Sequence, residues 1–347
     1  MSEPLNIPPG RRRYDALIGT GGIGSGAFFA LKGRHTLGRE ESRGGRFLDR
    51  RDYCKLHIVA HYAAVLMGKG FAVRPVGRVG DDETGRRLLE EMRRAGVDLR
   101  HVETAAGEQT MYSICLIYPD GSGGNLTVDD SACSRVTAEF VSRCEDDLAE
   151  FQGRGIALAA PEVPLAARAR LLAMAGRHGF FRAASFVSGE LTEAREIGML
   201  ADADLLALNA DEAAALAGVG PGGDPADVAK AAAGALREGE GKKLMSVTAG
   251  RAGSWAWDGE RMTHYPAVEV PVVGTAGAGD AHLSGLLVGL SAGLSFDDAC
   301  RLASLVAALS VTSPHTIDDR VDRRSLRALA DSRGLELSAE LAALLGG

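Results

Sequence analysis

The chain is poor in aromatic residues, which make up 5% of it, and its five cysteines contain no CxxC pair. Closely spaced cysteines would indicate disulfides or a zinc site, so their scatter favours a reduced, cytoplasmic setting. The sequence also lacks a run of about 18 apolar residues, and its first residues contain no apolar signal core. We therefore expect no membrane partner.

The chain also has no excess of basic residues. The net charge is -7, which argues against nucleic acid as a partner. The 347 residues are 46% hydrophobic and include 45 glycines, a composition that allows a large core with many tight turns. Collagen-like and disordered chains do not have this composition.

Short apolar segments alternate with stretches of helical spacing along the chain. This alternation predicts a single α/β domain over residues 1–347, with a mostly parallel sheet covered by helices on both faces. We expect strands near 14–18, 71–76, 156–160, 180–187, 204–208, 243–248 and 268–273, a hairpin at 253–257 and 261–265, and helices over 54–67, 82–94 and 276–311.

Two segments, roughly 27–53 and 108–130, fit this alternation poorly. The first contains several glycines and a dense charge cluster, and the second contains a hairpin pattern around 119–123. We interpret both as insertions that form a small β lid over the functional site. An ordinary surface excursion is the alternative.

The segment 274–281, GTAGAGDA, is the most informative motif. Small residues let the backbone approach a ligand, and free N–H groups at the start of the following helix bind anions. A carboxylate at this position, Asp280, lies beside the bound phosphate and can accept a proton from an attacking hydroxyl. Phosphoryl transfer needs little else beyond positioning and charge stabilisation. The alternative is that Asp280 only caps a helix.

Two further motifs follow predicted strands, where open α/β sheets place ligands. Asn209 could contact a phosphate and Glu212 could hold Mg²⁺ through water, or the two could form a capping box. Thr248, Gly250 and Gly253 form a turn that suits a nucleotide, although a plain hairpin loop is equally compatible.

A competing pattern, G-x-G-x-x-G, occupies residues 19–24 and would indicate a dinucleotide fold if a helix followed it. Glycines and charges interrupt that helix, so we interpret the loop as a wall of the acceptor pocket. His57 and His61 have the i, i+4 spacing of metal ligands. Only Cys54 stands near them as a further ligand, so packing or pocket polarity is the better interpretation.

Together these motifs resemble the ribokinase-like, or PfkB, family of carbohydrate kinases, from about residue 14 to residue 317. VVGTAGAGDAHLSG (272–285) is similar to the family's C-terminal signature, and the segments VGRVGDD (76–82) and AGVD (95–98) are similar to its glycine-containing stretch. Asn209 and Glu212 match its NxxE motif, and Thr248, Gly250 and Gly253 match its TxGxxG loop.

The resemblance implies a three-layer α/β sandwich with a small β lid, and an ATP- and Mg²⁺-dependent enzyme. Asp280 is then the catalytic base, and the family leaves a monovalent-cation requirement open. A homodimer joined through the lid is also expected. The other implied assignments are an anion hole at Gly277, Ala278 and Gly279, nucleotide contacts from Asn209, Thr248, Gly250, Gly253 and Thr275, and Glu212 at the metal.

The chain departs from the family mainly on the acceptor side. Gly274 stands where the signature often begins with Asp, and Gly24, followed by Ser25, stands where many members carry a sugar-binding Asp. The family's Gly-Gly is displaced to residues 44–45, and Cys54-Lys55 occupy its usual place. The residues assigned to the acceptor are Gly22, Gly24, Ser25, Gly45, Lys55 and His57.

We therefore predict an ATP-dependent kinase that phosphorylates a hydroxyl of a sugar, with a nucleoside kinase as the alternative. An NAD(P)-dependent oxidoreductase and a non-catalytic sensor are hypotheses of other classes. Because Gly24 replaces a carboxylate and Lys55 and Arg39 suit anions, we predict that D-ribose is a poor substrate and that an atypical or anionic sugar is preferred.

Overall fold

The computed structural model describes residues 2–33, 37–119, 123–237 and 243–346, and its central feature is a nine-stranded sheet. The strands are β1 (Ala16–Thr20), β5 (Ala72–Gly80), β6 (His101–Ala105), β9 (Gly155–Ala159), β10 (Phe181–Ala184), β11 (Leu205–Asn209), β12 (Leu244–Thr248), β13 (Ser254–Trp257) and β14 (Met262–Tyr265). Their order is β14-β13-β12-β11-β10-β9-β1-β5-β6. The strands from β12 to β6 pair in parallel, whereas the β12–β13 and β13–β14 pairs are antiparallel.

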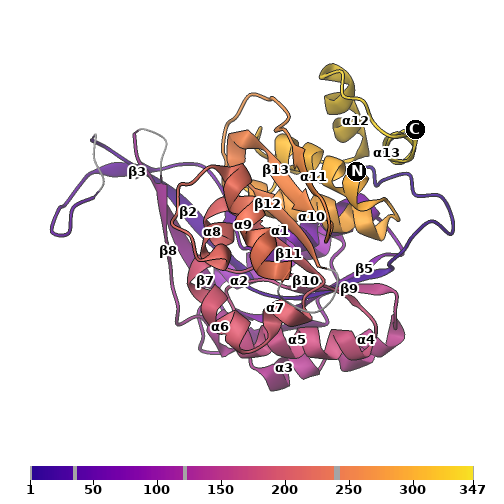
Figure 1. Ribbon diagram of the computed structural model, residues 1–347. Helices are drawn as coiled ribbons and strands as arrows, with labels where there is room; N and C mark the ends of the chain where they lie inside the picture. The colour runs from indigo at the N-terminus through magenta and orange to yellow at the C-terminus, as the bar shows by residue number, and fades with distance from the viewer. Residues whose placement is uncertain (1, 34–36, 120–122, 238–242, 347) are drawn as a thin grey trace.

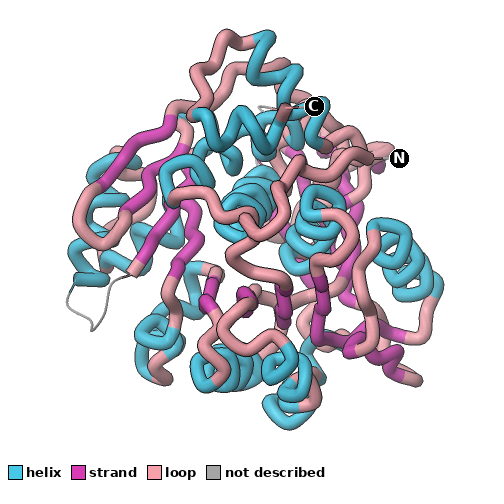
Figure 2. Tube along the Cα trace, turned by 90° about the vertical axis from the view of Figure 1, so that its right-hand side faces the viewer, coloured by secondary structure: helices cyan, strands magenta, loops and turns pink. Residues whose placement is uncertain are grey.

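Helices cover both faces of this sheet, so the molecule has three layers (Figure 2). One face holds α1 (Lys55–Met67), α2 (Glu83–Ala95), α10 (Ala278–Ser291), α11 (Phe296–Ser310), α12 (Arg323–Ser332) and α13 (Ala339–Leu345). The other face holds α3 (Ala138–Ser142), α4 (Glu145–Glu150), α5 (Leu165–Arg177), α6 (Leu191–Glu196), α7 (Met199–Asp202), α8 (Ala210–Ala217) and α9 (Pro225–Arg237).

The central strands β1 and β9 are buried at every position, because helices cover both of their faces. Leu17 of β1 packs in the α1–α10 layer, whereas its neighbour Ile18 packs against α3 and α5. In β11, Leu205 likewise packs in the α1–α10 layer, whereas Leu206 packs in the opposite layer. This arrangement confirms the expected three-layer sandwich.

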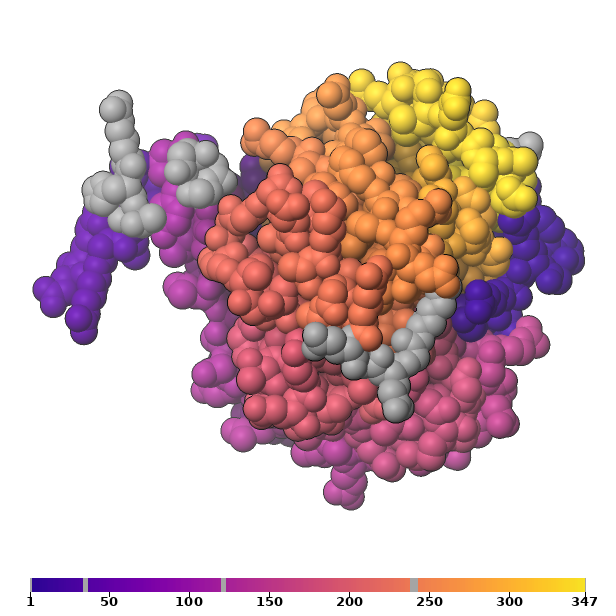
Figure 3. All heavy atoms as spheres, viewed as in Figure 1, coloured from indigo at the N-terminus to yellow at the C-terminus, as the bar shows by residue number. Residues whose placement is uncertain are grey.

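A second, five-stranded sheet stands beside the main body (Figures 1 and 3). It contains β2 (Gly24–Leu31), β3 (Gly45–Phe47), β4 (Asp52–Tyr53), β7 (Met111–Ile117) and β8 (Gly123–Thr127). β2 and β7 pair in parallel, and the other pairs are antiparallel. Both segments assigned to a lid thus supply strands to one small sheet. Residues 34–36 and 120–122 of these segments lie outside the described part of the chain.

Several boundaries differ from the sequence-based expectations. The expected strand at 268–273 is wrong, because this segment is irregular and lines a cavity instead of pairing with the sheet. The stretch 276–311 is two helices separated at Gly293, whose φ of +81° breaks the first of them. The helix that a dinucleotide site would need after Gly24 is also absent, since β2 begins at that residue.

The parallel strands present their carboxyl ends at one edge of the large sheet, and this edge positions the site. Asn209 is the last residue of β11 and Thr248 is the last residue of β12, and the two are paired in register. α10 begins near them because the hairpin β13–β14 returns the chain to the same edge. The lid strand β2 leaves β1 at this edge as well.

The turn before β13 depends on Gly253, which makes its replacement a sharp test of the fold. Gly253 has φ of +88°, and a Cβ atom there would lie 2.1 Å from the carbonyl oxygen of Tyr265. We expect Gly253→Ala to lower the free energy of unfolding by about 3 kcal/mol or more, from backbone strain and displacement of β14. Urea denaturation measures this loss.

Gly250 provides the matched control, because its φ is +54° but nothing lies within 4 Å of the added Cβ. Gly250→Ala should lower the free energy of unfolding by only about 1–2 kcal/mol, because it adds backbone strain without a steric clash. Equal losses in the two variants would show that the contact with Tyr265 does not constrain the turn.

Candidate active site

A cavity of about 240 Å³ lies at the carboxyl ends of β11 and β12, and we call it the inner cavity. Its lining residues are Lys55, Ala207, Leu208, Asn209, Glu212, Ser246, Thr248, Gly277, Gly279, Asp280, His282 and Leu283. The structure thus brings together residues from four separate sequence segments that were expected to act together. Lys55 is the only lysine or arginine among the described residues that line it.

Asp280 lies in the first turn of α10, whose N-cap is Gly277 with φ of +77°. A side chain at Gly277 would collide with Thr316, since the added Cβ would lie 2.7 Å from Thr316 Cβ. The first backbone N–H groups of a helix have no partner within it and can bind an anion. This geometry places donors and a carboxylate side by side in the inner cavity.

Lys55 opens α1 and forms an ion pair with Asp280, with 3.3 Å between Nζ and Oδ1. Only 19% of its side chain is exposed. Burial alone would lower the pKa of Lys55, but the charges of Asp280, Glu212 and Glu162 outweigh this effect and raise it. Lys55 is therefore a charged ammonium group at neutral pH.

Asn209 and Glu212 form a reciprocal capping box at the start of α8. Glu212 N–H donates to Asn209 Oδ1 at 2.8 Å, and Asn209 N–H donates to Glu212 Oε2 at 2.8 Å. Glu212 is buried, and burial raises its pKa while the charge of Lys55 opposes the increase. Both residues cap the helix and also line the inner cavity, so the capping box is confirmed while the phosphate and Mg²⁺ roles stay predictions.

A second cavity of about 630 Å³ adjoins the first, and we call it the outer cavity. Asn209, Thr248 and Gly279 line both cavities. The other expected members, Gly250, Gly253, Thr275 and Ala278, lie at the outer cavity. Its remaining walls are largely aliphatic and come from Val268, Val270, Val272, Ala307, Ala308 and Val311.

The sequence analysis missed Glu162, which follows β9 at the same edge of the sheet. Among the described residues it is the only non-glycine with positive φ, at +78°. Its Oε2 is buried without a hydrogen-bond partner, and burial with the nearby charge of Asp280 raises its pKa to about 7. The signal was available, because Glu162 follows the end of β9 and Asn209 stands at the end of β11.

Asp52 of β4 is a second missed carboxylate, and it comes from the lid sheet. The Cys115 thiol donates to Asp52 Oδ2 at 3.3 Å. Burial raises the pKa of Asp52, and the charge of Asp280 adds to the increase. Asp280 therefore influences Asp52, Lys55, Glu162 and Glu212, and we call these five residues the Asp280 cluster.

His282 forms part of the floor beneath both cavities. Its Nε2 lies 3.0 Å from Ser246 Oγ, and burial lowers its pKa to about 4. A neutral, buried imidazole of this kind supports the shape of the site and carries no charge at pH 7.

The residues assigned to the acceptor are dispersed. Gly22 packs against Glu162, and Gly24 packs against Met111 and the Cys54 thiol, so both lie near the Asp280 cluster. Ser25 donates to the carbonyl oxygen of Asp52, and Arg87 donates to Ser25, which joins the lid to α2.

Gly45 and His57 lie elsewhere. Gly45 begins β3 in the lid and packs against Phe29 and Ala30. The His57 ring is 1% exposed and its centroid lies 4.7 Å from that of Tyr53. Neither residue lines the inner or the outer cavity.

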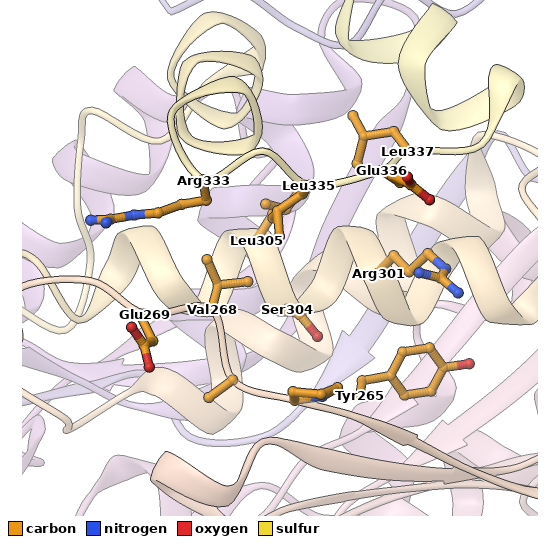
Figure 4. Close-up of a pocket in the computed structure, with 12 residues that line it drawn as sticks. Tyr265, Val268, Glu269, Arg301, Ser304, Leu305, Arg333, Leu335, Glu336 and Leu337 are labelled. Atoms are coloured by element: carbon orange, nitrogen blue, oxygen red, sulfur yellow. The ribbon is translucent and has the colours of Figure 1, made fainter.

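A third cavity of about 490 Å³ lies beside the outer one, between α11 and the segment after α12 (Figure 4). Val268, Leu305 and Leu335 gather at its centre, and Arg333 and Arg301 lie toward opposite ends. Val268 and Ser304 also line the outer cavity. No member of the Asp280 cluster is present here.

Comparison with known proteins shows a family to which the chain is similar. Residues 59–323 match the family described as pfkB family carbohydrate kinase. The chain is 30% identical to fructoselysine 6-kinase of Shigella flexneri over 233 residues, which is 67% of this chain and 80% of that protein. It is 28% identical to a fructokinase of Klebsiella pneumoniae over 230 residues, covering 62% and 70% of the two chains.

Solved structures share the fold at low sequence identity. Arabidopsis thaliana ribokinase complexed with ribose and ATP has a TM-score of 0.70 and 21% identity, over 91% of this chain and 98% of that one. Ribokinase of Cryptococcus neoformans in complex with ADP has a TM-score of 0.73 and 20% identity, over 92% and 99%. No helix in the described ranges is long and apolar enough to cross a membrane.

The raised pKa of Glu162 predicts how the free energy of unfolding depends on pH. A carboxyl group whose folded pKa lies above its unfolded value stabilises the fold only while it is protonated. This stability is present below the unfolded pKa of about 4.5 and is lost as the pH rises through about 7. We expect Glu162→Gln to increase the free energy of unfolding by about 1–3 kcal/mol at pH 8, and to have little effect at pH 4.5.

Thermal unfolding at the two pH values measures this difference, and the exposed Glu196→Gln provides the control. A variant that unfolds at the same temperature as the natural protein at pH 8 would show that ionised Glu162 is already fully paired.

Proposed function

The chain belongs to the pfkB family of carbohydrate kinases, and we propose that it transfers the γ-phosphate of ATP to a sugar hydroxyl held against Asp280. The observation that carries this proposal is the position of Asp280 in the first turn of α10, in one cavity with Gly277 and Gly279. A base and a set of anion-binding donors there are what phosphoryl transfer requires from a protein.

The proposed reaction is an in-line displacement. The acceptor oxygen attacks the γ-phosphorus while its proton moves to Asp280, and the bond between this phosphorus and the bridging oxygen of ADP breaks. The electron pair leaves with ADP. Backbone N–H groups of Gly277 and Gly279 stabilise the charge on the transferred group, whereas the N–H of Ala278, which was also expected to contribute, donates to the Thr275 carbonyl oxygen at 3.3 Å.

The outer cavity fits the nucleotide donor. Its aliphatic walls suit the flat face of a base, and Asn209, Thr248 and Thr275 provide polar atoms where it meets the inner cavity. Mg²⁺ usually binds through one or two carboxylates together with phosphate oxygens and waters, and it would supply charge neutralisation on the phosphates. Glu212 fits that role, because it lines the inner cavity and one of its carboxylate oxygens lies outside the capping box.

The acceptor side is rich in carboxyl groups, which suits a polyhydroxylated sugar. Gly24 lacks a side chain that could hydrogen-bond to sugar hydroxyls. Asp52 and Glu162 instead provide carboxyl groups within electrostatic range of Asp280. Because the carboxyl groups near Asp280 would repel an anion and Lys55 is the one cation among the described residues that line the inner cavity, we infer that the acceptor is a neutral sugar. The sequence predicted an atypical or anionic one. The names of the relatives, fructoselysine 6-kinase and fructokinase, support a fructose-derived acceptor.

A panel of acceptors tests the proposed function directly. Release of ADP coupled to phosphorylation is followed with fructose, fructosyl-amines, ribose, 2-keto-3-deoxygluconate, sugar phosphates and nucleosides. A fructose-derived sugar with the highest kcat/KM supports the proposal, whereas a preferred nucleoside supports the alternative kinase. Failure with every acceptor would leave the non-catalytic sensor as the better hypothesis.

The oxidoreductase alternative loses its structural basis, since β2 replaces the helix that a dinucleotide site needs. A monovalent-cation requirement stays a prediction that rates in potassium and choline chloride would test. The cytoplasmic location, and the lack of nucleic-acid and membrane partners, also stay predictions.

Asp280→Asn removes the proposed base with little change in shape. We expect kcat to fall roughly 10²–10⁴-fold, the usual range for loss of a positioned base, while ADP affinity and the unfolding temperature stay close to those of the natural protein. Steady-state kinetics and calorimetric ADP titration measure these quantities. Turnover within about threefold of the natural protein would exclude Asp280 as the base.

The lid supports the proposed homodimer through its outward face. Directly paired residues in neighbouring strands lie on one face of a sheet, and the register places Phe29, Phe47, Tyr112, Ile114, Leu126 and Val128 on the same face. Phe47 and Leu126 are 66% and 63% exposed. Contiguous exposed apolar surface of this kind is typical of interfaces, and we infer that a second copy covers it.

We expect Phe47→Glu with Leu126→Glu to convert the dimer to a monomer, because burying two charges opposes association. Light scattering after size exclusion measures the mass. Val219→Glu, at an exposed position outside the lid, is the control and should remain dimeric. A natural protein that is monomeric at about 50 µM would contradict the proposed interface.

A further inference from the structure

The side chain of Lys55 is poorly explained by the folding of α1 alone. It is the first residue of that helix, where the helix dipole opposes a positive charge. The N-cap Cys54 makes no side-chain cap bond, and the first turn contains no acidic residue. The helix therefore provides no local compensation for the ammonium group.

Carboxyl groups on the other side of the inner cavity compensate the positive charge of Lys55. Lys55 faces Asp280 at 3.3 Å, and Glu212 and Glu162 add to its electrostatic stabilisation. Lys55 thus reaches from α1 to the start of α10, whose first-turn N–H groups bind anions. One cation and a set of oriented donors lie at the same small cavity.

We propose that Lys55 is a catalytic residue that binds the phosphoryl group during transfer, an inference that rests on the proposed kinase function. The acceptor hydroxyl has to approach Asp280, so the transferred phosphorus lies next to the atom that Lys55 contacts. The ammonium group donates hydrogen bonds to the non-bridging phosphoryl oxygens and keeps its protons throughout. Charge on these oxygens is stabilised more strongly in a site that excludes water.

This role differs from binding an anionic acceptor, although both use the same charge. A lysine that holds an acceptor group changes KM for the acceptor. A lysine that stabilises the phosphoryl group in transit changes kcat, because the interaction strengthens in the transition state. The two roles are therefore separable by kinetics.

The test compares Lys55→Met, which keeps the length of the side chain and removes its charge, with Lys55→Arg. We expect Lys55→Met to lower kcat roughly 10²–10³-fold with KM for the acceptor changed less than about threefold. Lys55→Arg keeps the charge and should recover part of the rate. Lys69→Met, at an exposed position away from the cavities, is the matched control and should behave like the natural protein.

A binding measurement completes the experiment without knowledge of the acceptor. The affinity for ADP with Mg²⁺ and aluminium fluoride, which imitates the phosphoryl group in transfer, should fall at least tenfold in Lys55→Met, while affinity for ADP alone stays constant. Unchanged affinity for the aluminium fluoride complex, or a rise in acceptor KM at constant kcat, would overturn the assignment. Absence of transfer by the natural protein would instead refute the proposed function.

Discussion

Charge balance at one edge of the sheet is the constraint on which the site depends. The carboxyl groups of Asp52, Glu162 and Glu212 each lie within electrostatic range of Asp280, and Lys55 contributes a positive charge that pairs with Asp280. Several partly buried carboxylates without a cation would repel one another and take up protons. The pKa of Glu162 shows part of that cost, because it rises to about 7 even with Lys55 nearby.

The topology explains how such distant residues meet. Parallel strands end at a common edge, so residues that follow β9, β11 and β12 become neighbours although about 90 positions separate Glu162 from Thr248. Packing of α1 against α10 brings Lys55 to Asp280 from the opposite end of the chain. The lid adds Asp52 on the inner face of its sheet, whereas its outer face exposes Phe47 and Leu126.

Local patterns predicted much of this fold and part of the site. Asp82 and Gly96 delimit α2 as their cap chemistry indicated, and the GTAGAGDA segment leads into a helix as expected. The strand at 268–273 was a wrong prediction, because an apolar run that lines a cavity has the same composition as one that pairs in a sheet. His57 was assigned to the acceptor for its polarity, yet it packs against Tyr53 in the interior.

The residues that the sequence did not reveal are those whose role comes from long-range contacts. Nothing in the segment around Asp52 distinguishes it from neighbouring lid charges, and only the pairing of β4 with β2 directs it inward. Glu162 combines a strained φ with an unpaired buried oxygen, a state that a protein retains only when the surrounding structure holds it. A ligand hydroxyl that donates to this oxygen would remove the unmet hydrogen bond. In the proposed reaction, the unpaired oxygen of Glu162 would thus favour binding of the acceptor, and the charge of Lys55 would favour binding of the phosphoryl group.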